Sequence, residues 1–192
     1  MKNFNRRDFL KLTGLTALAL TFSACGSSKP DVPATEDAQE ILDEINAYRD
    51  SKGFKPLVYN KNLENWAAED IRCFETQNTT KVGGANWSNW HMKADGTDMK
   101  PEYASAIDGL KNEGFNSLAP EYFGVKETGT EENKQYDLNV VFPATATELQ
   151  NQIAELTNQF NDTVRYIGIA SAAINGQTYW VAMMLPKKPT DD

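Results

Sequence analysis

Three consecutive segments together constrain the fold: Val164-Arg-Tyr-Ile-Gly-Ile-Ala-Ser-Ala-Ala-Ile174, Asn175-Gly176 and Gln177-Thr-Tyr-Trp-Val-Ala-Met-Met-Leu185. The two longer runs are rich in β-branched and aromatic residues, which is typical of strands. The Asn-Gly pair between them is the dipeptide that best supports a two-residue type I′ turn. The stretch therefore predicts an antiparallel hairpin.

Apolar residues at three- and four-residue intervals predict amphipathic helices before the hairpin. These helices span residues 36–51, 60–75, 101–111 and about 145–160. Thr35 and Asn60 stand where N-caps are expected, and Thr145 with Glu148 matches a capping box. Helices first and a hairpin last predict a single α+β domain over residues 36–186, followed by a short tail at 187–192.

The segments between the predicted helices have less regular patterns. Residues 54–59 are expected to be an extended linker, and residues 136–142 a short strand. Residues 76–100 are rich in Gly, Asn, Thr and Asp, so we expect one long surface loop there, and loops of that length are often functional. Residues 116–134 are expected to be irregular, with a solvated acidic cluster at 127–132.

The first 24 residues have the layout of an export signal. Arg6 and Arg7 precede an apolar run, and the small residue Ala24 precedes Cys25. The run is shorter than the ~20 residues that cross a bilayer, so we expect a cleaved signal peptide at 1–24 rather than a transmembrane helix.

Two short motifs refine that expectation. The block around Arg6 and Arg7 resembles a twin-arginine signal, and Phe22-Ser-Ala-Cys25 resembles a bacterial lipobox, whose cysteine is acylated. Residues 25–35 then form an acylated cysteine and a flexible tether. The expected location is the bacterial cell envelope, outside the cytoplasm, with the membrane bound through the acyl anchor on Cys25.

The charge of the chain argues against several partners. The formal net charge is −8, and it becomes −11 when the predicted signal peptide, which carries four basic residues and one acidic residue, is removed. Such a chain repels phosphate backbones and anionic headgroups, so we expect no nucleic-acid partner. Cys73 is then the one remaining cysteine, and its place in a helical pattern predicts a buried, unreactive thiol.

The only histidine of the chain, His91, lies in Trp87-Ser-Asn-Trp-His-Met-Lys-Ala-Asp-Gly96. A lone imidazole can bind a metal, carry a proton or simply satisfy a structural hydrogen bond. Trp87 and Trp90 can line a ligand groove or cover the core. The residues alone leave these alternatives open.

Five segments occur in an order that resembles a known family. They are Ile45-Asn46-Ala-Tyr-Arg49 with Pro56-Leu57, Trp66-Ala-Ala with Arg72-x-x-Glu75, His91-Met-Lys-Ala-Asp95-Gly96, Leu110-Lys-x-x-Gly114-Phe115 with Pro120-Glu121-Tyr122, and Tyr166-Ile-Gly-Ile-Ala with Asn175-Gly-x-x-Tyr179-Trp180-Val181. The sequence resembles the bacterial extracytoplasmic form of the CAP superfamily, the SCP-like cysteine-rich secretory, antigen 5 and pathogenesis-related proteins. The resemblance covers most of residues 37–185.

The resemblance implies an α-β-α sandwich with a C-terminal hairpin and a central cleft. That cleft usually holds two histidines and two acidic residues, which bind a divalent metal in some members. His91 matches the first histidine and Glu121 the first glutamate, and the two are expected to face each other across the cleft. The segment expected to carry the second histidine, residues 147–162, has none. We therefore expect no tight zinc site, and only a weak divalent-metal site at His91 and Glu121 stays open.

Three classes of function follow. The first is a non-enzymatic lipoprotein that binds a small apolar or glycan-like ligand, or a partner protein, through a cleft lined by His91, Glu121, Trp87 and Trp90. The second is a hydrolase in which His91 and Glu121 form a general acid/base pair. The third is a structural surface module. We favour binding, because no Ser-His-Asp pattern, thiol nucleophile or paired-carboxylate motif stands out.

Overall fold

The C-terminal hairpin forms the centre of the computed structural model of this protein. Strands β6 (Val164–Ile174) and β7 (Gln177–Pro186) pair antiparallel along nearly their whole length. Asn175 and Gly176 at the turn have φ values of 52° and 77°, the positive pair that a type I′ turn requires. The predicted hairpin is confirmed.

The structure describes residues 31–93, 95–116, 118, 121–138, 146–160 and 162–191. Two short strands complete the hairpin's sheet, in the order β1-β6-β7-β3. Strand β1 (Val58–Tyr59), within the segment expected to be a linker, runs parallel to β6, and β3 (Glu121–Phe123) runs antiparallel to β7.

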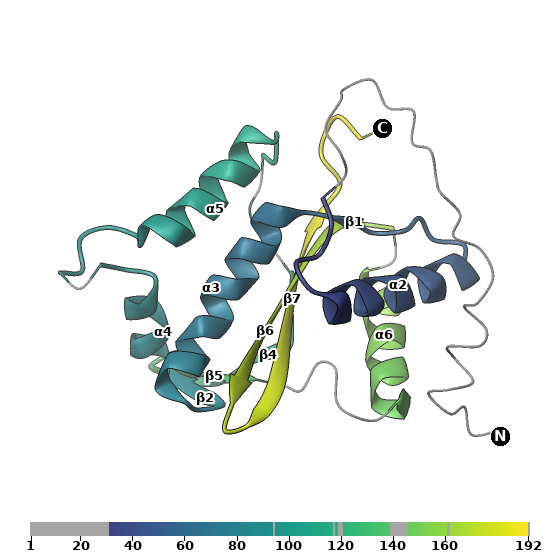
Figure 1. Cartoon of the computed structure of the whole chain (residues 1–192). Coiled ribbons are helices and arrows are strands. Elements are labelled where there is room, and N and C mark those ends of the chain that lie inside the picture. The colour runs from purple at the N-terminus through teal and green to yellow at the C-terminus, as the bar shows by residue number, and fades with distance from the viewer. Residues whose placement is uncertain are drawn as a thin grey trace.

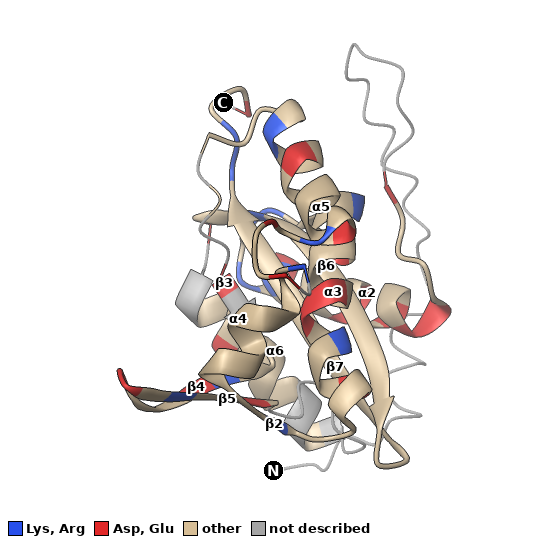
Figure 2. Cartoon of the chain, turned by 90° about the vertical axis from the view of Figure 1, so that its left-hand side faces the viewer, with Lys and Arg blue, Asp and Glu red and all other residues tan. Residues whose placement is uncertain are grey.

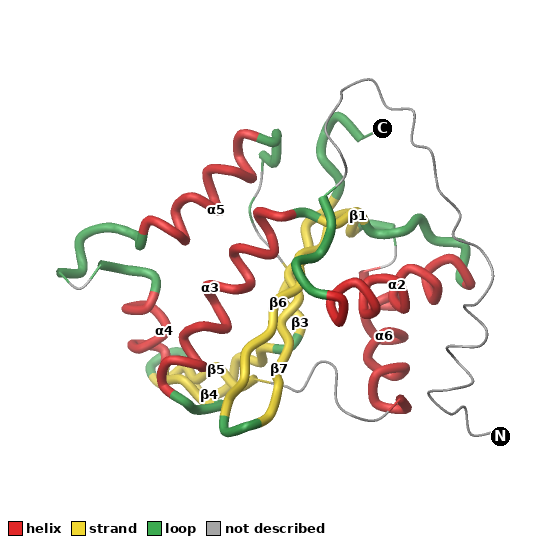
Figure 3. The backbone as a smooth tube through the Cα atoms, viewed as in Figure 1, coloured by secondary structure: helices red, strands yellow, loops and turns green. Residues whose placement is uncertain are grey.

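Helices cover both faces of this sheet (Figures 1 and 3). Helix α3 (Lys61–Gln77) packs on one face, with α5 (Pro101–Asn112) against it. Helices α2 (Glu36–Ser51) and α6 (Ala146–Phe160) lie over the other face. The described residues thus form the α-β-α sandwich that the resemblance implies.

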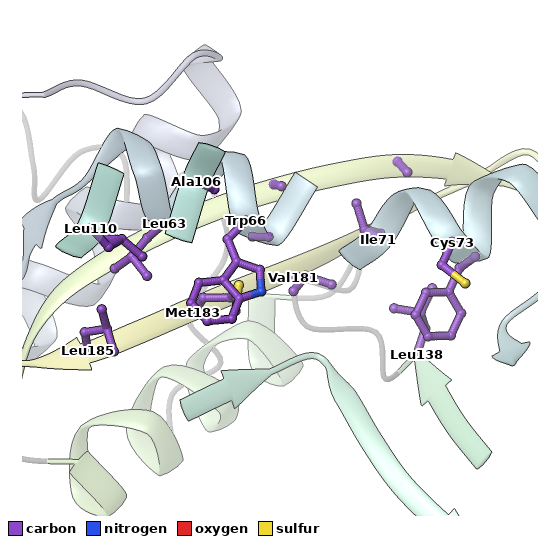
Figure 4. Close-up of a cluster of buried hydrophobic side chains, with 14 of the residues drawn as sticks. Leu63, Trp66, Ile71, Cys73, Ala106, Leu110, Leu138, Val181, Met183 and Leu185 are labelled. Carbon is purple, nitrogen blue, oxygen red and sulfur yellow. The ribbon is translucent and has the colours of Figure 1, made fainter. Parts of the chain in front are cut away.

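Alternate residues of the hairpin divide between two buried clusters, because successive strand side chains point to opposite faces. Val181, Met183 and Leu185 pack under α3, as Figure 4 shows, whereas Trp180, Ala182 and Met184 belong to the cluster under α2 and α6. The side chains of β7 therefore alternate between the two helical layers, one set facing α3 and the other facing α2 and α6.

The start of α3 approaches β6 closely at Gly168. A Cβ atom at Gly168 would lie 2.1 Å from the backbone nitrogen of Glu64, well inside van der Waals contact. Glycine is required here by the space between helix and strand, since its φ is not in the left-handed region.

Both predicted N-caps at the start of the chain are confirmed. Thr35 Oγ1 accepts a hydrogen bond from Ala38 N in α2, and Asn60 Oδ1 accepts one from Leu63 N in α3. Helix α6 is also found where it was expected, but Thr145 lies outside the described residues and the capping box stays a prediction.

The expected surface loop at residues 76–100 was predicted too simply. It contains strand β2 (Lys81–Gly83) and helix α4 (Gly84–Trp90). Residues 116–134 likewise contain β3, β4 (Val125–Thr130) and the start of β5 (Asn133–Leu138), and a three-stranded sheet in the order β2-β5-β4 results. These strands are set by pairing between distant segments, which local periodicity does not report.

The two ends of the described chain are both held near the start of α3. Asp31 Oδ2 accepts a hydrogen bond from Lys61 N, so the segment predicted to be a flexible tether is fixed at least from Asp31 onward. At the C-terminal tail, Tyr166 donates to Asp191 at 2.7 Å, and Lys188 Nζ lies 3.5 Å from a Glu113 carboxylate oxygen. The predicted signal peptide and Cys25 lie outside the described residues.

Candidate functional site

His91 caps the C-terminal end of α4 and lies against the buried side of α3. Its Nε2 atom lies 2.6 Å from Asp70 Oδ1, and since a carboxylate oxygen accepts, the ring N–H donates. The Asp70 side chain is fully buried, and that of His91 is 12% exposed. A short hydrogen bond to a charged acceptor in such a setting is among the stronger interactions that proteins make.

Aromatic rings enclose the imidazole. The ring centroids of His91 and Tyr103, on α5, are 4.2 Å apart, and those of His91 and Trp87, on α4, are 5.3 Å apart with the rings nearly perpendicular. Trp87 in turn stacks on Tyr136 of β5 at 4.5 Å. Rings on α4 and α5 therefore hold the imidazole in one orientation, Tyr136 supports Trp87 from behind, and Asp70 on α3 supplies the hydrogen bond.

The same surroundings act on Tyr103. Burial, and secondly the negative charge of Asp70, raise the pKa of its phenol to about 12. The tyrosine is therefore protonated at neutral pH and serves here as a packed ring rather than as a base.

Trp90 is attached to α3 instead of standing free in a groove. Its indole Nε1 donates to the backbone oxygen of Glu69 at 2.8 Å, and Lys100 Nζ lies 3.4 Å from the ring centroid. Trp87 and Trp90 both pack against the buried cluster under α3. Of the two alternatives for the tryptophans, covering the core is the one that these contacts favour.

Glu121 lies on the other side of the central sheet. It pairs with Met184 in the β3–β7 ladder, and its strand neighbour Phe123 packs against the cluster under α2 and α6. His91 lies over the α3 face. Among the described residues the histidine's hydrogen-bonded carboxylate is Asp70, so the expected pairing of His91 with Glu121 was wrong.

A shallow hollow of about 280 Å³ lies beside this site, between α3 and α5. We call it the α3–α5 groove. Two alanines with small side chains, Ala68 and Ala106, line part of it, and its other lining residues carry charged, amide and hydroxyl groups. It is lined by Asn65, Ala68, Glu69, Arg72, Glu102, Ser105 and Ala106. At its rim Arg72 forms an ion pair of 2.8 Å with the buried Glu69.

The residues around His91 do not fit a metal. Within the described part of the chain, no group of three or more His, Cys, Asp or Glu side chains is arranged to hold an ion. The single nitrogen donor is engaged with one carboxylate, and tight zinc sites need three or four protein ligands.

Cys73 is buried, as the sequence predicts. Burial raises the pKa of its thiol to about 11, so little of the reactive thiolate is present at neutral pH.

Asp70 and Tyr103 were not predicted as site residues, although the position of Asp70 in the sequence of α3 carries a signal. Leu63, Ala67, Asp70 and Phe74 follow one another at three- and four-residue steps, so the carboxylate falls on the apolar stripe of α3. A charged group on a buried stripe requires a partner. His91 is the partner that the fold supplies.

The fold and site together define the class: an α-β-α sandwich whose single histidine lies at the end of α4 and is hydrogen-bonded to α3. The sequence model of the cysteine-rich secretory protein family, CAP, matches residues 42–184, and this chain belongs to that family. Comparisons with curated proteins and with solved structures found no match. Of the helices in the described ranges, none has the length and apolar character to cross a membrane.

Proposed function

We propose that this CAP domain is an extracytoplasmic binding protein, held to the membrane by an acyl chain on Cys25, and that it acts without catalysis. The observation that carries the proposal is the engagement of His91. A general acid or base must reach the proton that it transfers. An imidazole hydrogen-bonded to a buried carboxylate, with Trp87 and Tyr103 against its ring, is better suited to holding α4 on α3.

The hydrolase alternative has less support. It requires His91 and Glu121 to act on one substrate, and the contacts of the two residues lie on opposite faces of the central sheet. The Asp70–His91 bond does correspond to the orienting half of a nucleophilic triad, but the described hydrogen bonds bring the ring a carboxylate and no hydroxyl or thiol.

The α3–α5 groove is the site that we assign to the ligand. Arg72, Glu102 and Ser105 at its rim are exposed and offer both donors and acceptors. An apolar ligand requires a pocket lined mainly by apolar and aromatic side chains, whereas five of the seven residues that line this groove are polar or charged. Of the expected ligand classes, a glycan-like ligand fits this groove best.

The test is ligand-observed saturation-transfer NMR with chitotriose, and with palmitate as the apolar probe. Arg72→Ala removes the main donor of the groove. Lys111→Ala is the matched control, because Lys111 also forms an i,i+3 ion pair on an exposed helix face but does not line the groove. We expect transfer to chitotriose with wild type and Lys111→Ala, and its loss with Arg72→Ala. Transfer to palmitate alone, or equal transfer in all three proteins, contradicts the assignment.

A further inference from the structure

The segment Asp31–Thr35 has a fixed place on the domain. Asp31 accepts from Lys61 N at 2.8 Å, and Glu64 Oε2 accepts from Ala34 N at 3.3 Å. Glu64 is itself held by the hydroxyl of Tyr59 at 2.6 Å, and both side chains are buried. The chain therefore leaves the domain at the first turn of α3 and not at the start of α2.

The distance from this point to Cys25 is short. Five residues, 26–30, separate Cys25 from Asp31. Six steps of fully extended chain span roughly 20 Å at about 3.3–3.6 Å per residue. Helix α3 has 17 residues, and at about 1.5 Å per residue it is roughly 25 Å long. An acyl chain on Cys25 thus keeps the start of α3 close to the bilayer, while its far end can lie well away.

The two ends of α3 differ in what surrounds them. At the end where α3 begins, the end of α5 and the C-terminal tail lie beside it, and Lys61 pairs with Glu64 and Lys111 with Asp108. At the other end the β4–β5 hairpin projects from the body (Figure 2), and Lys134 pairs with two of its glutamates. Lysines and carboxylates are paired at both ends, so the orientation follows from the place of the Asp31–Thr35 segment and the short distance to Cys25.

We infer that the acylated protein stands on the bilayer surface by the end of α3 that begins at Lys61, with the β2–β5–β4 sheet pointing away from the membrane. The inference rests on the proposed acyl anchor. It assigns a membrane-facing surface made of the Asp31–Thr35 segment, the end of α5 and the C-terminal tail.

The test uses the full-length, acylated chain in phosphatidylethanolamine–phosphatidylglycerol vesicles that contain a headgroup spin-labelled lipid. A single cysteine for a fluorophore is introduced by Asn112→Cys at the end of α5, or by Glu132→Cys at the hairpin tip. Both positions are exposed, and the native Cys73 is buried. We expect the lipid to quench the label at position 112 several-fold more than the label at 132. Asp31→Ala, which releases the first contact of the segment, should reduce that difference.

The outcomes separate the two proposals. Membrane-bound protein with equal quenching at both positions, or stronger quenching at 132, overturns the orientation and leaves the anchor intact. If the protein stays out of the vesicle fraction and mass spectrometry finds no acyl group on its Cys25 peptide, the anchor fails and the orientation fails with it.

Discussion

At the scale of single residues, the only histidine of the chain is used to join helices. His91 contacts Asp70 on α3, Tyr103 on α5 and Trp87 on its own helix. The hydrogen bond satisfies a carboxylate that is fully buried, which is costly without a polar partner. His91 is thus part of the packing between α3, α4 and α5.

We expect His91→Ala to destabilise the fold by about 2–3 kcal/mol, because it removes a hydrogen bond to a charged buried group. Chemical denaturation monitored by tryptophan fluorescence measures this loss. Glu121→Gln is the control and should stay within about 0.5 kcal/mol of wild type, since Glu121 is exposed. Equal stability of His91→Ala and wild type would show that the contact contributes nothing to the fold.

The buried thiol predicts a dependence of stability on alkaline pH. The pKa of Cys73 is raised from its ordinary 9.0 to about 11, so the unfolded thiol ionises first. The neutral thiol of Cys73 therefore contributes fully to the free energy of unfolding below pH 9. As pH rises from 9 toward 11 that free energy falls by on the order of 2 kcal/mol. Denaturation at pH 8 to 11 should show this decline, and Cys73→Ala should decline less steeply. Parallel declines in both proteins would exclude the thiol as a source.

At the scale of elements, the packing of α3 on β6 depends on one glycine. We expect Gly168→Ala to cost about 3 kcal/mol or more, since a methyl group would meet the backbone of Leu63 and Glu64 and overpack the core. Gly83→Ala is the control, because nothing lies within 4 Å of a Cβ there and its φ is not left-handed. Thermal unfolding of the two variants measures the difference. Similar melting temperatures would show that α3 can shift without loss.

The elements that could be predicted are those whose signal is local. The stripe of α2, the caps Thr35 and Asn60 and the Asn175-Gly176 turn each act within a few residues, and the structure has them as expected. Helix α5 begins at the predicted residue, Pro101, and its buried stripe is carried by Ala106 and Leu110, with Tyr103 packed against the same cluster.

The elements that were missed depend on distant partners. Strand β4 has exposed residues on both faces and no apolar alternation. It forms because Val125–Thr130 pairs with Asn133–Leu138. Helix α4 lacks a side-chain N-cap and has no buried residue of its own, so its place depends on the contacts of its two tryptophans and of His91 at its end.

At the scale of the whole molecule, the α-β-α fold separates His91 and Glu121, whose contacts lie on opposite faces of the central sheet. The order of the sequence motifs carried the resemblance to the family, and that resemblance implied the sandwich. It could not predict the partner of His91, since strand register decides which face of the sheet Glu121 occupies. A sequence motif can identify which residue matches a family position, but the pairing of strands determines which side chains come into contact.

Zinc should not stabilise this protein. A metal that binds the folded state with a dissociation constant far below its concentration raises the melting temperature. Among the described residues His91 and Asp70 supply too few ligands for such a site. Calorimetric scans with zinc and with EDTA should therefore superimpose. Stoichiometric zinc that survives dialysis against a weak chelator would contradict this.

His91 is joined to Asp70 and not to Glu121. Because the chain has a single histidine, selective ¹⁵N-histidine labelling gives the imidazole signals of His91 alone. We measure the Nε2 shift at neutral pH in wild type, Asp70→Asn and Glu121→Gln. The predicted result is a large change with Asp70→Asn and none with Glu121→Gln. A change with Glu121→Gln and none with Asp70→Asn would show that Glu121, and not Asp70, is the partner of His91.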